Sequence, residues 1–145
     1  MTRRAAPSLQ DPIATLESAI AALMGRGARP AETKRFDRYL RLLLQWNRIH
    51  RLTGKDSPNA IVSGLFIDSL LFLSNLPAGP IRVADLGTGP GIPGIPLRVV
   101  REDITLTAVE SRRKPASFLA ALKRELAFTR NETVLLIDHF FFPND

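Results

Sequence analysis

The chain has 145 residues, of which 45% are hydrophobic and 23% are charged, so it is long enough for one compact domain and short for two independent ones. It contains no cysteine, which excludes disulfides, thiolate metal sites and any mechanism that uses a cysteine nucleophile. Twenty basic residues against fourteen acidic ones give a net charge of +6, an excess that favours a phosphate-rich partner.

Residues 1–76 are expected to form a helical region. Asp11 followed by Pro12 is typical of a helix start, and apolar residues then recur at helical spacing. The same spacing predicts helices over residues 30–49 and 58–74, the first with an apolar surface broad enough to contact more than one neighbour. That surface comprises Phe36, Tyr39, Leu40, Leu42, Leu43, Trp46, Asn47 and Ile49, and the helix over 58–74 is marked by Ile61, Leu65, Ser69 and Phe72.

Residues 77–145 are expected to form the first half of an α/β domain. Short apolar runs predict strands over residues 81–86, 104–109 and 133–137. Helices predicted over 96–101 and 114–128 separate these strands. The resulting βαβαβ order predicts parallel strands joined by right-handed crossovers.

No N-terminal stretch has the hydrophobic core of a signal peptide. The segment poorest in charge, residues 60–81, is interrupted by Asp68, glycine and proline, which makes it a poor membrane span. We therefore expect a soluble protein of the cytoplasm that makes no membrane contact.

The segment Asp85–Gly94 lies where the first predicted strand turns into a helix. Its glycines allow a ligand to approach the backbone, and the following helix start offers unpaired N–H groups. A nucleotide-like ligand fits this pattern. The spacing of Gly89, Gly91 and Gly94 also satisfies the dinucleotide motif, so NAD is the rival cofactor.

Two carboxylates flank this loop. Asp85, at the end of the first strand, can bind a cation such as the amino group of S-adenosylmethionine but would repel a pyrophosphate; the alternative is a turn-forming role. Glu110 ends the second strand, where an acidic residue can accept hydrogen bonds from both hydroxyls of a ribose; the alternative is a helix-capping or surface carboxylate.

The chain resembles the bacterial family of ribosomal RNA small-subunit methyltransferase G, also called glucose-inhibited division protein B. The resemblance extends over about residues 36 to 128. The motifs that carry it are L-Q-W-N at 44–47, F-I-D-S at 66–69, D-L-G-T-G-P-G-I-P-G-I-P-L at 85–97 and E-S at 110–111.

The resemblance implies a Rossmann-like S-adenosylmethionine-dependent methyltransferase fold with an N-terminal helical cap. It implies methyl transfer from S-adenosylmethionine to N7 of a guanosine in 16S ribosomal RNA. Because guanine N7 has a free lone pair, this transfer needs alignment more than a strong base. We therefore assign no residue a catalytic role, and we expect no metal. The implied cofactor contacts are Asp85, Gly87, Thr88, Gly89, Gly91, Pro93, Glu110 and Asp138.

The expected partner is 16S ribosomal RNA or the small ribosomal subunit. Basic residues gather between residues 34 and 55 and again after Glu110, and they can contact phosphate or form an ordinary solvated surface. His50, at a helix end, is expected to be a surface or capping group. The candidate RNA contacts are Arg48, Arg51, Lys55, Arg112, Arg113 and Lys114.

The chain also departs from the family pattern. Gly64 and Leu65 stand where members usually carry Arg-His, and the later strands of the family's sheet are missing. The sheet is therefore expected to be incomplete and C-terminally truncated, with exposed apolar surface at residues 140–142. The alternative function is an inactive remnant that binds nucleotide or RNA without turnover.

Overall fold

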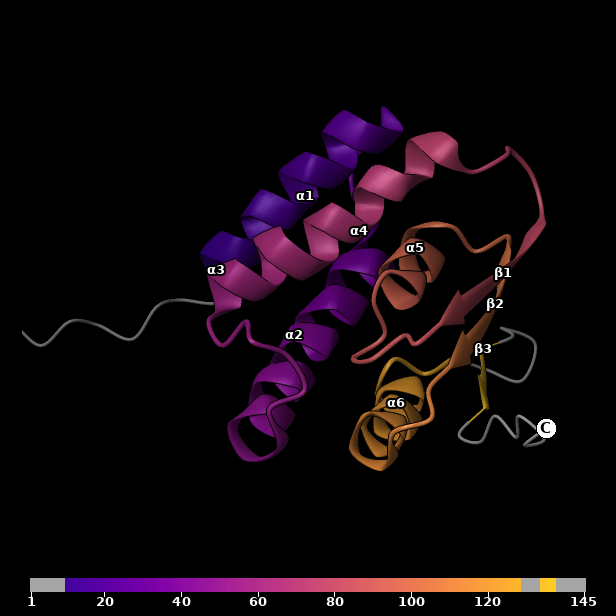
Figure 1. Ribbon diagram of the computed structural model, residues 1–145. Coiled ribbons are helices and arrows are strands. Elements are labelled where there is room, and N and C mark those ends of the chain that lie inside the picture. The colour runs from indigo at the N-terminus through magenta and orange to yellow at the C-terminus, as the bar shows by residue number, and fades with distance from the viewer. Residues whose placement is uncertain (1–9, 129–133, 138–145) are drawn as a thin grey trace, which may run out of the picture.

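The computed structural model describes residues 10–128 and 134–137 of the chain (Figure 1). Helices come first and strands alternating with helices follow. The first group is α1 (Gln10–Met24), α2 (Pro30–His50), α3 (Pro58–Ile61), the π-helical η1 (Val62–Ile67), α4 (Asp68–Leu70) and the 3-10 helix η2 (Leu71–Asn75). The second is β1 (Ile81–Leu86), α5 (Gly94–Val100), β2 (Ile104–Val109), α6 (Arg113–Glu125) and β3 (Val134–Ile137).

The three strands form one parallel sheet in the order β1-β2-β3. The register places Ile81 beside Ile104 and Leu86 beside Val109, so β1 and β2 end at the same edge of the sheet. The predicted α/β class, the βαβαβ order and the N-terminal helices are confirmed.

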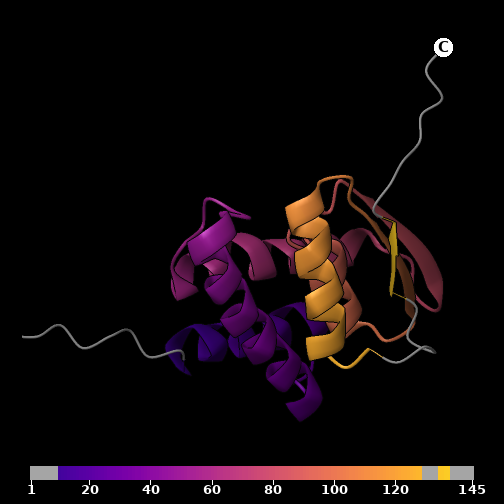
Figure 2. The ribbon, with the colours of Figure 1, turned by 90° about the horizontal axis from the view of Figure 1, so that it is seen from below.

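The described helices lie on one side of the sheet (Figure 2). Along β1, Ile81, Val83 and Asp85 are half-buried, whereas the alternating side chains point to the opposite face and are exposed. Leu86, the last of these, is 71% exposed. Within the described ranges no strand pairs with the outer edge of β1, so both this edge and the outer face of β1 are open.

One hydrophobic core joins the N-terminal helices to the α/β part. α2 lies at its centre, because it packs against α1, α5 and α6. The Tyr39 ring is 4.6 Å from that of Phe66 and 6.4 Å from that of Phe118, centroid to centroid. All three side chains are fully buried. The core therefore crosses the predicted division at residue 76.

The third predicted helix is interrupted. The π turns of η1 hold more residues per turn than an α-helix, which shifts the buried face along the chain. Phe72 is consequently 52% exposed, so its expected place on the buried stripe is wrong. The expectation that Ile49 widens the apolar surface of α2 is also wrong, since it is 75% exposed near the free end of that helix. The buried face comprises Ile61, Val62, Phe66, Ser69 and Leu70.

A partly buried ion pair ties the start of α2 to the end of α5. The Arg26 guanidinium donates to Glu32 at 2.6 Å and to the carbonyl of Val100 at 3.2 Å. The Glu32 carboxylate also accepts from the backbone N–H of Arg29, which caps the start of α2. Pairing with Glu32 raises the pKa of Arg26. This contact fixes the helices against the part of the chain that carries the glycine loop.

Candidate functional site

The loop after β1 is anchored to the end of β2. The N–H groups of Gly87 and Thr88 both donate to the carbonyl of Val109, at 2.9 and 3.1 Å. Inside the loop the Thr88 hydroxyl and the N–H of Gly94 donate to Oδ2 of Asp85, at 2.7 and 2.9 Å. Asp85 thus braces the turn, as the alternative interpretation of this residue required.

The second carboxylate oxygen of Asp85, Oδ1, accepts no hydrogen bond from the described residues. Bracing the turn through Oδ2 therefore leaves one acceptor of the same carboxylate for a ligand. Gly94 is required beside it, because a Cβ at that position would lie 2.8 Å from Oδ2. Bracing the loop and binding a cation are compatible roles for Asp85.

Tyr39 holds the loop from the side of α2. Its hydroxyl donates to the carbonyl of Pro90 at 2.5 Å. Gly91, with φ of 96°, approaches so closely that a Cβ there would lie 2.6 Å from the tyrosine oxygen. Burial, with a smaller contribution from Asp85, raises the pKa of Tyr39 well above its ordinary value, so the hydroxyl remains a donor. Sequence reasoning placed Tyr39 only in the core.

Glu110 directly follows β2, and its carboxylate reaches the glycine loop. The residue is only 4% exposed. Its Oε2 accepts from the N–H of Gly89 at 2.9 Å, and its Oε1 accepts from the N–H of Arg112 at 2.8 Å. The Arg112 guanidinium lies over the same carboxylate, with nitrogens 3.2 and 3.3 Å from the two oxygens. Burial acts to raise the pKa of Glu110, but these hydrogen bonds outweigh it and lower the pKa below its ordinary value.

Asp85 and Glu110 therefore flank one glycine loop at the carboxyl ends of two adjacent parallel strands, the usual ligand position in open α/β sheets. The space beside Gly87 is open, since a Cβ there would meet no atom within 4 Å. A ligand with hydroxyl donors and a cationic group fits this set of acceptors. Among the predicted contacts, Thr88 is buried and Pro93 occupies the N-cap position of α5. Asp138 lies outside the described residues, as do residues 140–142.

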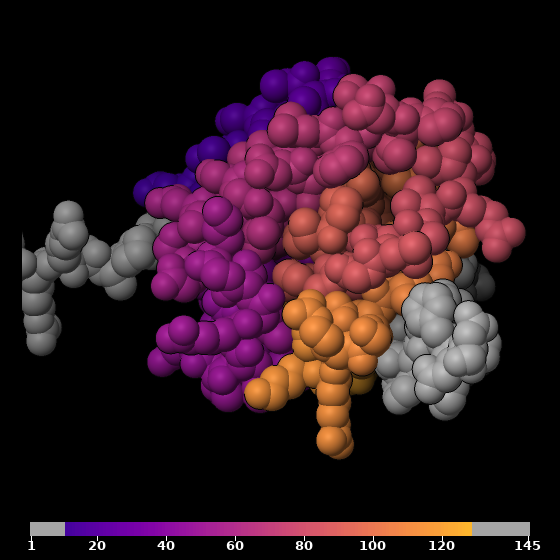
Figure 3. Space-filling model, in the orientation of Figure 1, coloured from indigo at the N-terminus to yellow at the C-terminus, as the bar shows by residue number. Residues whose placement is uncertain are grey.

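Four of the six candidate RNA contacts come together in space. A hollow of about 330 Å³ lies between the end of α2 and the start of α6. Figure 3 shows the purple end of α2 beside the orange start of α6, where side chains project from the body. The hollow is lined by His50, Arg51, Leu52, Arg112, Arg113, Lys114 and Pro115, so Arg48 and Lys55 do not contribute to it.

Lys55 instead lies against Gly64, one of the two departures from the family pattern. A Cβ at Gly64 would lie 2.8 Å from Cε and 3.2 Å from the ammonium nitrogen of Lys55. A cationic group therefore occupies the space above position 64. No sequence pattern signals this contact, because it depends on how the loop after α2 returns over η1.

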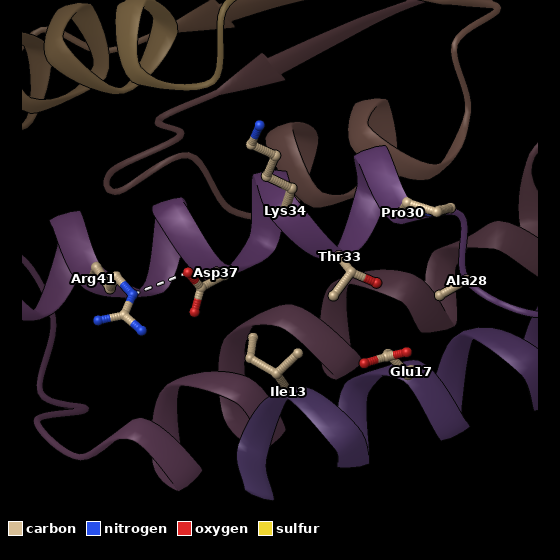
Figure 4. Close-up of a pocket in the computed structure, with 8 residues that line it drawn as sticks. All are labelled: Ile13, Glu17, Ala28, Pro30, Thr33, Lys34, Asp37 and Arg41. Atoms are coloured by element: carbon tan, nitrogen blue, oxygen red, sulfur yellow. Dashed lines mark hydrogen bonds and ion pairs between the residues drawn. The ribbon is translucent and has the colours of Figure 1, made fainter. Parts of the chain in front are cut away.

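A larger hollow, of about 520 Å³, lies between α1 and α2 (Figure 4). Its lining is mixed in charge, and the Arg41 guanidinium is paired with Asp37 at 2.9 Å. It has neither a glycine turn nor convergent side chains of one charge, so its size alone assigns it no chemistry. The lining residues are Ile13, Glu17, Ala28, Pro30, Thr33, Lys34, Asp37 and Arg41.

In residues 10–128 and 134–137, no helix has the length and apolar character needed to cross a membrane. The same residues hold no group of three or more His, Asp or Glu side chains that could bind a metal ion.

Comparison with known proteins identifies the family of the chain. The family model described as rRNA small subunit methyltransferase G matches residues 32–136. Three relatives, each named "Ribosomal RNA small subunit methyltransferase G", come from Xanthomonas oryzae pv. oryzae, Nitrosospira multiformis and Methylobacillus flagellatus. The Xanthomonas protein is 44% identical over a match that covers 61% of this chain and 41% of its own length. The Nitrosospira protein is 36% identical over 89% of this chain and 55% of its own length. The Methylobacillus protein is 38% identical over 72% of this chain and 51% of its own length.

This chain thus spans about half the length of the curated relatives that it matches. The family model nevertheless covers most of the chain and includes both Asp85 and Glu110. The resemblance that the motifs predicted is confirmed, and the chain belongs to the rRNA small subunit methyltransferase G family.

Proposed function

We propose that this chain forms the cofactor-binding part of an S-adenosylmethionine-dependent methyltransferase that acts on N7 of a guanosine in 16S ribosomal RNA in the cytoplasm. The observation that carries the proposal is the buried Glu110 carboxylate, which is held against the N–H of Gly89 at the carboxyl ends of β1 and β2. Family membership supplies the reaction class.

Each carboxylate has a separate role in this proposal. Glu110 accepts hydrogen bonds from the two ribose hydroxyls of the cofactor, and before the cofactor binds its depressed pKa keeps it ionised and ready to accept. Oδ1 of Asp85 accepts from the ammonium group at the amino acid end of the cofactor, while Oδ2 keeps the loop in place. Gly87, Thr88, Gly89, Gly91 and Pro93 shape the backbone between them.

When bound, the cofactor supplies a methyl group on a sulfonium centre. Guanine N7 carries its own lone pair, so a methyl transfer that breaks the sulfur–methyl bond and leaves the neutral thioether would require no proton to be removed from the nucleophile, and the chain needs no general base for it. The work of the protein residues is to bind, to orient and to exclude water. The basic residues Arg51, Arg112, Arg113 and Lys114, with Arg48 and Lys55 outside the hollow, provide contacts for the RNA backbone.

The test is calorimetric titration of the purified chain with S-adenosylhomocysteine. Replacing Glu110 by Gln removes a charged acceptor, a change worth about 1.5–3 kcal/mol, so we expect the affinity to fall at least tenfold. Asp85→Asn should weaken binding similarly. Glu102→Gln is the matched control, because Glu102 is an exposed carboxylate in the turn before β2, away from the glycine loop.

Circular dichroism establishes that each variant is folded before titration. Saturable binding that is weakened in the first two variants and retained in the control supports the proposal. Equal affinity in all folded variants, or tighter binding of NAD than of S-adenosylhomocysteine, contradicts it.

A second candidate is a remnant that binds cofactor or RNA without turnover. It is favoured by the open edge and outer face of β1 in the described residues, where Leu86 is 71% exposed. Transfer of a labelled methyl group from S-adenosylmethionine to undermethylated small ribosomal subunits separates the two. Transfer supports the enzyme, whereas binding without transfer supports the remnant.

A further inference from the structure

The hollow between α2 and α6 concentrates positive charge from two distant parts of the sequence. Arg51 follows the end of α2, and Arg112, Arg113 and Lys114 surround the start of α6. No acidic side chain lines the hollow, and none of the described residues forms an ion pair with Arg51, Arg113 or Lys114. Four cationic residues around one hollow form a positively charged surface that a bound anion neutralises.

The backbone at Arg51 is in a conformation that residues with a side chain seldom adopt. Its φ of 46° and ψ of 61° are left-handed, at a helix end where glycine is the favoured residue. A side chain at this position makes the left-handed conformation less favourable than it is for glycine. Arg51 therefore combines a left-handed backbone with a cationic side chain that lines the hollow.

Arg112 belongs to both the cofactor site and the hollow. Its guanidinium covers both oxygens of Glu110 and lies 3.6 Å from where a Cβ on Gly89 would be, yet its side chain is 67% exposed and lines the hollow. Ribose hydroxyls need those same carboxylate oxygens. A cofactor bound at Glu110 therefore releases Arg112, whose charge then requires another anion.

We propose that the hollow binds a backbone phosphate of the RNA substrate, and that Arg112 transfers from Glu110 to this phosphate when the cofactor binds. This inference rests on the proposed function, because it takes the ligand of Glu110 to be the cofactor ribose. It follows that cofactor and RNA bind cooperatively, each favouring the position of Arg112 that the other needs. By linkage the effect is reciprocal.

Phosphate binding in the hollow is tested with a short fluorescein-labelled single-stranded oligoribonucleotide, whose binding is measured by fluorescence anisotropy over a range of salt concentrations. Arg51→Gly removes the charge and the backbone strain together, so the variant should be at least as stable as the unchanged chain. We expect its RNA affinity to fall at least fivefold and the slope of log affinity against log salt to decrease by about 0.7. The control is Ala127→Gly, which relieves a similar strain (φ of 52°) at the far end of α6 without changing charge.

If Arg51→Gly binds RNA with the same affinity and salt dependence as the unchanged chain, the proposal that the hollow binds phosphate is overturned. Inorganic phosphate is titrated in place of RNA to identify the source of the anion. If inorganic phosphate binds as tightly as the oligoribonucleotide with the same dependence on Arg51, RNA is not the specific ligand and the proposal fails in that respect.

The coupling is tested by repeating the RNA titration with saturating S-adenosylhomocysteine. In the unchanged chain we expect RNA affinity to increase at least threefold. Arg112→Gln should abolish this increase, whereas Arg113→Gln should weaken RNA binding but keep it, since Arg113 lines the hollow and makes no hydrogen bond to Glu110. An increase that persists in Arg112→Gln overturns the coupling.

If S-adenosylhomocysteine does not bind at all, the proposed function fails and the coupling fails with it. The comparison of Arg51→Gly with Ala127→Gly needs no cofactor, so it still decides whether the hollow binds RNA phosphate.

Discussion

Replacing Tyr39 by phenylalanine removes a single hydroxyl from the contact between α2 and the glycine loop. In the structure this hydroxyl is fully buried and donates to the carbonyl of Pro90 at 2.5 Å. A lost buried hydrogen bond costs about 0.5–1.5 kcal/mol, and a carbonyl left without a partner brings the total to about 1–3 kcal/mol. We expect a loss of this size in the free energy of unfolding, measured with urea.

The loss should also reach the cofactor site, because Pro90 lies between Gly89 and Gly91. If about 0.7–1.4 kcal/mol of it comes from a less ordered loop, the affinity for S-adenosylhomocysteine falls about threefold to tenfold. Ser69→Ala is the matched control: its buried hydroxyl also donates to a backbone carbonyl at 2.5 Å, that of Leu65, but in the N-terminal helices. Equal cofactor affinity in Tyr39→Phe and Ser69→Ala would refute the reasoning and reduce Tyr39 to a packing residue.

Three further outcomes are expected from the same structure. Ser57→Ala removes the side-chain cap of α3, which accepts from the N–H of Ala60, and should lower the free energy of unfolding by about 1 kcal/mol in urea titrations. Glu32→Gln removes the charge of the buried partner of Arg26 and should lower the free energy of unfolding by about 1–3 kcal/mol, a value that a thermal melt within error of the unchanged chain would contradict. The depressed pKa of Glu110 predicts a stabilising contribution that is present above its ordinary pKa of 4.5 and disappears as the pH falls through the lower folded value, so Glu110→Gln should flatten the acid side of a stability profile.

The strands could be predicted from sequence almost residue by residue. β1 and β2 begin and end where the apolar runs do, since glycine stops the first and Glu110 follows the second. The ends of the helices differ from the predicted ones by two or three residues. α5 begins at Gly94, two residues before the predicted start at Pro96, because the N–H of Gly94 is satisfied by Asp85 across the loop. α6 ends at Glu125, three residues early, because Ala127 turns left-handed.

The contacts that define the candidate site could be predicted only in part. The positions of Asp85 and Glu110 followed from strand order, but the partner of each carboxylate oxygen did not. Tyr39 is the only tyrosine in the chain and lies on a broad apolar helix face, so its buried hydroxyl had to find a partner. Identifying Pro90 as that partner requires the packing of α2 against the loop, which no periodicity encodes. The position of Arg112 over Glu110 depends likewise on how α6 begins.

The central place of α2 in the core has a consequence for synthesis of the chain. α2 leaves the ribosome before any strand exists, yet Tyr39 packs against Phe66 and Phe118, and the latter is made roughly 80 residues later. At bacterial translation rates this interval is about 4–16 seconds. During it the broad apolar face of α2 has only the N-terminal helices as neighbours, so we expect the nascent chain to be a substrate for chaperones until α6 emerges.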